Sequence, residues 1–149
     1  MNRRNFLVSG IMATLAAAPV FGSQAEDGIK RLGIQVSDGD PATYTKALNV
    51  AANFARGMSA KGEMYEIEIV AFNAGLNMLR TDKSPVIDRI KSMAESIPDL
   101  TFSACGNTIA GITKKEGAAP PLTSYARVVP GGVGRLMALD DSGYYVVRP

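Results

Sequence analysis

The stretch RLGIQVSDGDP, residues 31–41, decides the fold of this chain because it joins a predicted strand to a predicted helix. Apolar side chains alternate along its first half, at Leu32, Ile34 and Val36. Polar turn residues follow, and Asp40 with Pro41 is a helix-start signal, since an N-cap acceptor precedes a proline at the first helical position. Apolar residues then recur at helical spacing over 44–58. The stretch therefore predicts a β–α unit.

The stretch MYEIEIVAF, residues 64–72, predicts a second strand. Tyr65, Ile67 and Ile69 alternate with Glu66 and Glu68, so the apolar and acidic side chains are expected on opposite faces. The stretch becomes apolar on both faces from Val70 to Phe72. This pattern is typical of a strand that is buried at its carboxyl end.

The order of strand and helix continues to the C-terminus. Residues 73–83 read as a loop or a short turn of helix, and Ser84 with Pro85 predicts the start of a second long helix that ends at Pro98. The remaining elements are expected as a strand at 100–105, a helix at 107–116 capped by Asn107, a strand at 127–129, a helix at 130–142 and a strand at 144–149. Strands that alternate with helices imply an α/β protein with a parallel sheet covered on both faces.

Residues 1–25 are predicted to be an export signal and not part of the fold. Arg3 and Arg4 precede an apolar stretch, and a small-x-small pattern ends at Ala25. The Arg-Arg-x-Phe-Leu order resembles the twin-arginine export consensus. The apolar stretch is shorter than the ~20 residues that a spanning helix needs. We expect cleavage after Ala25, a single domain over 26–149, and a periplasmic protein without a membrane anchor.

The charge balance changes when this segment is set apart. The chain has 16 basic and 14 acidic residues, and the two arginines of the signal leave 14 of each in the rest. Nucleic-acid binding needs a clustered basic face, so no nucleic-acid partner is expected.

The chain contains no histidine and one cysteine. The missing histidine excludes Ser-His and Cys-His mechanisms and histidine metal sites. One cysteine without histidine cannot supply the usual zinc ligands. We therefore expect neither a metal nor an organic cofactor.

Three predicted strand ends are expected to meet at one edge of the sheet, where ligands of open parallel sheets bind. Cys105 ends the third strand just before a predicted helix, whose N-terminal N–H groups and dipole favour an anion and lower a thiol pKa. The candidate site residues are Cys105 as the reacting group, with Gly106, Asn107, Thr108, Asn73 and Asp38 as residues that stabilise an anion.

Each candidate also has a purely structural interpretation. A Cys-Gly pair at a strand end is common in packing, Asp38 suits a turn, and Asn73 suits a loop hydrogen bond. The spacing alone supports a packed and a reactive Cys105 equally. In the oxidising periplasm structural cysteines normally come in pairs, so a single one favours a free reactive thiol or an intermolecular bond.

The segments ACGNT at 104–108 and VPGGVGRLM at 129–137 carry a family resemblance. The chain resembles the DsrE/DsrF-like family, in its small exported branch, over residues 30–149. The resemblance implies a three-layer α/β/α fold with a five-stranded, mainly parallel sheet, and homo-oligomers that are often trimers or hexamers. In that family a cysteine at the end of the third strand receives sulfane sulfur as a persulfide and passes it on, and Cys105 matches that position.

Three functional hypotheses follow. The first is a periplasmic sulfur-binding or sulfur-transfer protein, whose partners are a sulfur donor and an acceptor thiol and whose persulfide forms on Cys105. The second is a non-enzymatic oligomeric scaffold or small-anion-binding module in which Cys105 is merely packed. The third is a redox sensor that forms an intermolecular disulfide.

Overall fold

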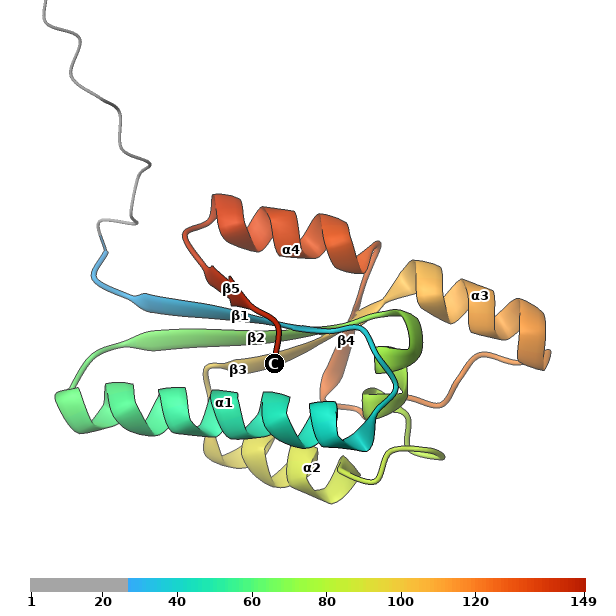
Figure 1. Cartoon of the computed structure of the whole chain (residues 1–149), viewed down its shortest axis with the longest axis horizontal. Helices are drawn as coiled ribbons and strands as arrows, with labels where there is room; N and C mark the ends of the chain where they lie inside the picture. Colours follow the sequence, from blue (N-terminus) through green and yellow to red (C-terminus); the bar gives the residue numbers. More distant parts are fainter. Residues whose placement is uncertain (1–26) are drawn as a thin grey trace, which may run out of the picture.

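Five parallel strands form one sheet between layers of helices in the computed structural model, which describes residues 27–149 (Figure 1). The predicted export signal lies outside the described residues. The elements in chain order are β1 (Lys30–Val36), α1 (Pro41–Lys61), β2 (Tyr65–Ala71), the 3₁₀ helix η1 (Asn73–Leu79), α2 (Ile87–Ser96), β3 (Leu100–Cys105), α3 (Gly106–Glu116), β4 (Ala126–Val129), α4 (Gly132–Asp141) and β5 (Tyr145–Val147). The predicted α/β class and three-layer α/β/α architecture are confirmed.

The strands lie in the order β4-β3-β2-β1-β5, so β2 is central. Their register brings the carboxyl ends together, because Ala71 pairs with Ala104 and Ala104 with Val128. Cys105 pairs one step further along, with Val129 of the edge strand β4. The residues that follow β2, β3 and β4 therefore emerge at one edge of the sheet.

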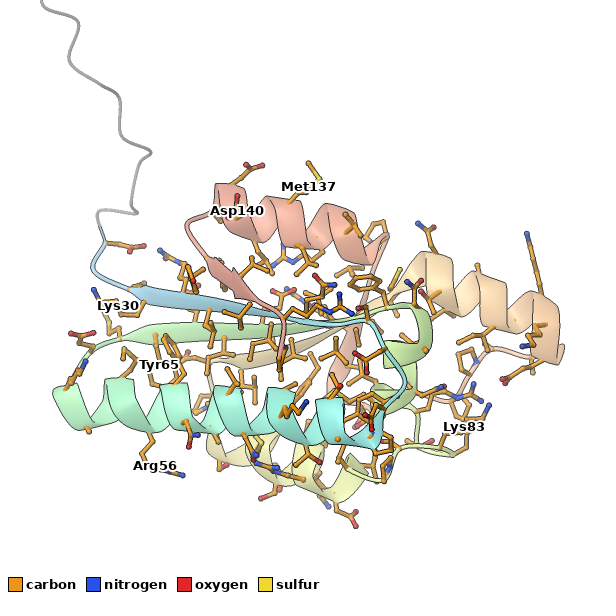
Figure 2. All side chains as sticks on the ribbon, in the orientation of Figure 1. Lys30, Arg56, Tyr65, Lys83, Met137 and Asp140 are labelled. Carbon is orange, nitrogen blue, oxygen red and sulfur yellow. The ribbon has the colours of Figure 1, made fainter. Side chains whose placement is uncertain are left out.

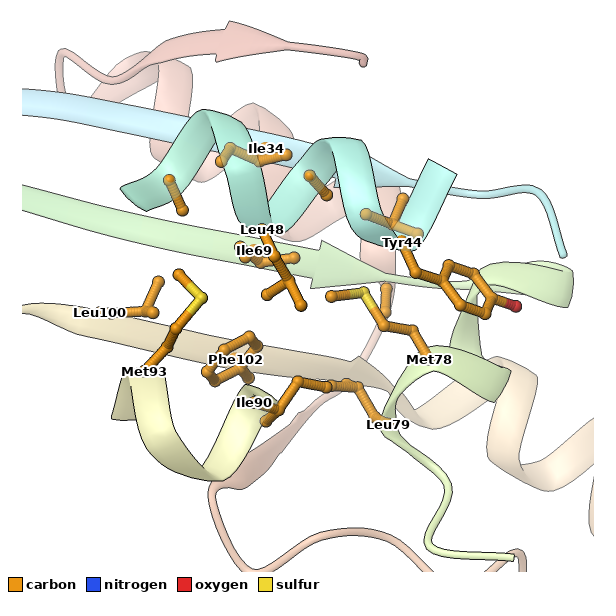
Figure 3. Close-up of a cluster of buried hydrophobic side chains, with 14 of the residues drawn as sticks. Ile34, Tyr44, Leu48, Ile69, Met78, Leu79, Ile90, Met93, Leu100 and Phe102 are labelled. Atoms are coloured by element: carbon orange, nitrogen blue, oxygen red, sulfur yellow. The ribbon is translucent and has the colours of Figure 1, made fainter. Parts of the chain in front are cut away.

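The larger hydrophobic core lies between the sheet and helices α1 and α2. Figure 3 shows its side chains from the sheet, from both helices and from η1. Ile34, Ile69 and Phe102 point into it from three neighbouring strands. Each such fully buried side chain contributes about 1.5–3 kcal/mol of hydrophobic stabilisation. This face therefore supplies most of the hydrophobic stabilisation of the described residues.

The opposite face of the sheet is covered by α4 and carries a smaller core. Its buried apolar residues are Val70, Phe72, Cys105, Leu136 and Leu139. Alternate residues of a strand point to opposite faces, so Ser103 and Cys105 of β3 share this face with Glu68 and Val70 of β2. The candidate nucleophile thus belongs to the face where polar groups are also buried.

Helix α1 begins as predicted. The Asp40 carboxylate accepts the Ala42 N–H at 2.9 Å, and Pro41 is the first helical residue. Gly62 ends the helix in the left-handed region, at φ 68°. None of the helices within residues 27–149 is long and apolar enough to cross a membrane.

Two predicted helix starts are wrong. Ser84 and Pro85 form a turn in which the Ser84 hydroxyl accepts the Val86 N–H at 3.3 Å, so α2 begins only at Ile87. Helix α3 begins at Gly106, and its N-cap is Cys105 instead of Asn107. Gly106 permits this early start, because a Cβ there would lie 3.1 Å from the Val129 carbonyl oxygen.

Candidate functional site

Cys105 occupies the junction between β3 and the N-terminus of α3. Its thiol is free and 5% exposed. The Gly132 N–H at the start of α4 donates to its sulfur across 3.2 Å. The first N–H groups of a helix have no partner within the helix. The sulfur therefore meets the N-termini of two helices, of which the sequence predicted one.

Close packing against Phe72 explains why position 132 is a glycine. A Cβ on Gly132 would lie 2.7 Å from Phe72 Cδ1, which is closer than real Cβ atoms approach a neighbour. The absence of a side chain lets the backbone of α4 approach the end of β2 and places its N–H on the Cys105 sulfur. Gly132 was not singled out as a site residue. The available signal was the pair of glycines in the first turn of the predicted helix 130–142.

Thr108 links the end of β2 to the thiol. The Asn73 N–H donates to the Thr108 hydroxyl oxygen at 3.0 Å, and the hydroxyl also interacts with Cys105. Asn73 is the described non-glycine residue with a positive φ, 50°, a region that asparagine tolerates better than most residues. Because the hydroxyl oxygen accepts the Asn73 N–H, its own proton is available to the sulfur.

The pKa of the Cys105 thiol is lowered from its ordinary value. Burial acts in the opposite direction and is the largest single influence. It is outweighed by the combined interactions with the Thr108 hydroxyl and with the N–H groups of Thr108, Gly132 and Asn107. The Asn107 N–H also donates to the Pro130 carbonyl at 3.2 Å. The site therefore favours the thiolate, which is the nucleophilic form.

A cavity of about 770 Å³ opens beside the thiol. We call it the Cys105 cavity. It is lined near the sulfur by Phe72, Asn73, Asn107 and Thr108, and further away by Asn77 and by residues of α3. Volumes of ~300–1,000 Å³ are typical of small-molecule sites. Although Cys105 is largely buried, it faces a space that a ligand can enter.

The structure brings together most of the predicted site residues. Asn73, Asn107 and Thr108 line the Cys105 cavity with the thiol. Gly106 does not line it, but its lack of a side chain lets α3 start against β4.

Asp38 does not belong to this group. Its carboxylate accepts the Asp40 N–H at 3.2 Å in the turn before α1, and it does not line the Cys105 cavity. The pKa of Asp38 is lowered, mainly by a hydrogen bond from Thr43. The turn interpretation of this residue therefore fits the structure better than an anion-stabilising role, which is difficult for a carboxylate in any case.

An ionic cluster around the buried Glu68 joins β2 to α4 and β4. Glu68 is 2% exposed and accepts the Ser103 hydroxyl at 2.6 Å. Arg135 of α4 donates to both of its carboxylate oxygens at 2.7 Å, and Arg127 of β4 donates at 2.6 Å. Burial raises the pKa of Glu68, but the hydrogen bonds from Arg135, Ser103 and Arg127 outweigh it and lower the pKa. The carboxylate is thus held ionised.

Alternation correctly predicted the face on which Glu68 lies, but not its burial. No sequence signal paired it with Arg127 and Arg135, which follow it by 59 and 67 residues. Arg135 lies one helical turn after Gly132, so the cluster anchors the part of α4 whose N–H contacts the thiol.

The fold and the site together define an α/β/α protein with a free thiol of lowered pKa at the carboxyl edge of its parallel sheet. No family model matches the chain, and no curated protein matches it. Among solved structures it is similar to the protein of unknown function MTH1491 from Methanobacterium thermoautotrophicum, with a TM-score of 0.66 and 25% sequence identity. The similarity covers 80% of this chain and 99% of that one. This similarity supports the fold but does not indicate an activity, because the function of the similar protein is unknown.

Proposed function

We propose that this chain is a periplasmic sulfur-binding or sulfur-transfer protein that carries sulfane sulfur as a persulfide on Cys105. The observation that carries the proposal is the position of the thiol. Its sulfur lies between two helix N-termini, its pKa is lowered, and it faces the Cys105 cavity. The resemblance to the DsrE/DsrF-like family, in which the matching cysteine accepts sulfur, adds support from the sequence.

The transfer is a substitution at sulfur. The Cys105 thiolate attacks the sulfane sulfur of a donor such as thiosulfate, and a new S–S bond forms. The donor S–S bond breaks, and its electron pair leaves with sulfite. The second transfer follows the same course, since an acceptor thiolate attacks the outer sulfur of Cys105–S–S⁻ and the Cys105 thiolate is released. No oxidant or reductant enters either step.

The groups that favour the thiolate also suit the persulfide. A persulfide anion places its charge one atom further out, toward the cavity. The Asn107 side chain and the Thr108 hydroxyl line that space, and helix N-termini stabilise anions in general. The site therefore has donors for both charge positions without a metal.

Mass spectrometry of the intact chain after incubation with thiosulfate or polysulfide tests the proposal. We expect wild type to gain the mass of one sulfur atom, and a reductant to remove it. Cys105→Ser should gain none. An unchanged wild-type mass, or an equal gain on Cys105→Ser, would contradict sulfur transfer by Cys105.

A second candidate is an oligomeric scaffold in which Cys105 is only packed. Exposed apolar side chains favour assembly, because Val128, Val133 and Met137 are 61%, 59% and 64% exposed. Val133 and Met137 lie one helical turn apart on α4, and Figure 2 shows Met137 pointing outward. Self-association into a trimer or hexamer would cover them.

The two candidates differ in the reactivity of the thiol. A packed Cys105 is alkylated slowly in the native chain and quickly only after unfolding. A stabilised thiolate beside an open cavity is alkylated quickly in the native chain. Measuring both rates with iodoacetamide, at concentrations where sedimentation shows the oligomer, decides between them.

A further inference from the structure

The Cys105 cavity continues along α3, away from the thiol. Thr108, Gly111, Ile112 and Lys115 line it, and their spacing of three, four and seven residues places them on one face of the helix. Ten residues separate Cys105 from Lys115, which is roughly 15 Å at the helical rise of about 1.5 Å per residue. The cavity therefore extends from the thiol along α3 as far as Lys115.

The opposite wall is formed by η1 and the loop that follows it. Asn73 and Asn77 lie on this wall near the thiol, and Arg80 and Lys83 lie further along it. Figure 2 places Lys83 on the loop after η1, toward the far end of α3. A ligand in the cavity thus meets amide groups near the sulfur and charged groups at the far end.

The far end has one cation in excess. Arg80 is 2% exposed and donates to Asp82 and Glu116 at 2.7 and 2.9 Å, and Lys83 donates to Glu116 at 3.0 Å. The two positive charges of these basic side chains therefore balance the two negative charges of their carboxylate partners. Lys115 also lines the cavity and forms no ion pair with a residue in 27–149. Its ammonium group is available to an anionic group of a ligand.

The size of the cavity matters as much as its charge. Its volume of about 770 Å³ lies well inside the range of ~300–1,000 Å³ that holds molecules of drug or tripeptide size. Thiosulfate and short polysulfides have only a few atoms and would contact the end near Cys105 alone. They would not contact Ile112 or Lys115.

We propose that the physiological donor is an organic persulfide of peptide size that carries a carboxylate, and this rests on the sulfur-transfer function proposed above. Its persulfide lies at Cys105, its amides face Asn73 and Asn77, and its carboxylate lies at Lys115. The Cys105 thiolate attacks the outer sulfur of R–S–SH, the donor S–S bond breaks, and the electron pair leaves on R–S⁻. The products are Cys105–S–SH and R–S⁻, so atoms and electrons balance without a further reactant.

Binding is tested apart from transfer with S-methylglutathione, which has the carboxylates and amides but no transferable sulfur. Titration calorimetry on the full chain carrying Cys105→Ser should detect saturable binding. Adding Lys115→Gln should weaken it about fivefold, as expected for the loss of a partly exposed charged contact. Lys114→Gln is the matched control, because Lys114 is the neighbouring exposed lysine and does not line the cavity.

Transfer is then measured as the rate of sulfur gain on Cys105 in the wild-type background. With glutathione persulfide, Lys115→Gln should lower the rate about fivefold at low donor concentration, and Lys114→Gln should leave it unchanged. With inorganic polysulfide, both variants should match wild type.

The outcomes separate the two proposals. Uptake of sulfur from inorganic polysulfide without any binding of S-methylglutathione overturns the donor class and leaves sulfur transfer standing. Equal effects of Lys114→Gln and Lys115→Gln on binding or on the transfer rate also overturn the proposed donor class, since they indicate that the surface charge in general, and not the Lys115 contact, attracts the donor. Failure of Cys105 to gain sulfur from either donor overturns the proposed function itself.

Discussion

The Gly132 N–H lies 3.2 Å from the Cys105 sulfur, although 27 residues separate the two in the chain. This contact joins the start of α4 to the end of β3. It adds a second helix N-terminus to that of α3, for which Cys105 is the N-cap, and both favour negative charge on sulfur. The reactivity of the thiol therefore depends on how α4 is held on the sheet.

Gly132→Ala is expected to raise the pKa of Cys105 and to destabilise the chain. The added Cβ would lie 2.7 Å from the Phe72 ring, so Phe72 and the start of α4 must move apart, and we expect the Gly132 N–H to leave the sulfur. Loss of a hydrogen bond to a charged group should slow alkylation of Cys105 about tenfold near neutral pH. Overpacking should lower the free energy of unfolding by about 1–3 kcal/mol. The alkylation rate and the free energy of unfolding are both measured on the purified variant.

Gly134→Ala is the control for this substitution. A Cβ there has no neighbour within 4 Å, so it should leave the thiol pKa unchanged and stabilise the helix slightly. If both alanine variants alkylate at the wild-type rate, the Gly132 N–H does not tune the thiol.

Thr108→Val is expected to raise the pKa of Cys105 without a large loss of stability. Valine keeps the shape of threonine but removes the hydroxyl that accepts the Asn73 N–H and interacts with the sulfur. Alkylation near neutral pH should slow by about three- to tenfold. Thr113→Val is the matched control, because its hydroxyl donates to the Ile109 carbonyl of its own helix at 2.8 Å. An equal slowing in both variants would assign the effect to α3 as a whole.

Local patterns were sufficient to predict most of the fold. The alternation at Leu32, Ile34 and Val36 and the Asp40-Pro41 signal are local, so β1 and the start of α1 were predicted correctly. Helix α3 was predicted to start too late because the early start depends on contact between Gly106 and the carbonyls of Val129, the last residue of β4, and Pro130. That contact joins segments that are distant in sequence.

The candidate site likewise contains residues that local patterns predicted and residues whose roles depend on contacts distant in sequence. Cys105, Asn107 and Thr108 are consecutive or nearly so, and a strand followed by a helix indicates where they meet. Gly132 and Glu68 were not singled out, since their roles depend on residues 27 and 67 positions away. A buried glutamate in an alternating strand has the same pattern as an exposed one. Only the packing of α4 distinguishes them.

Glu68→Gln is expected to cost about 3 kcal/mol of unfolding free energy. The amide leaves Arg127 and Arg135 without their shared carboxylate in a buried position, and breaking such a pair on one side typically costs ~3–5 kcal/mol. The lower end applies because both arginines are partly exposed, at 50% and 31%. Denaturant unfolding measures the change.

The same variant should slow alkylation of Cys105, because Arg135 anchors the helix that presents the Gly132 N–H. Glu63→Gln is its control, since the Glu63 side chain makes no hydrogen bond within residues 27–149 and should cost less than about 0.5 kcal/mol. Wild-type stability in Glu68→Gln would show that the cluster does not hold α4 in place.

We expect Glu116, at the far end of the Cys105 cavity, to make the free energy of unfolding sensitive to acid. Hydrogen bonds from Arg80 and then Lys83 lower the pKa of Glu116 from 4.5 to about 2. Because the folded pKa lies below the ordinary value, the stabilisation is fully present above about pH 4.5 and is lost as the pH falls toward 2.

Wild type should therefore exceed Glu116→Gln in unfolding free energy near neutral pH, and the difference should vanish in strong acid. Lys83→Gln removes one of the two donors, so the loss in that variant should begin at a higher pH. Denaturant unfolding of the three chains across this range measures the effect, and curves for wild type and Glu116→Gln that stay parallel down to pH 2 would exclude Glu116 as its source.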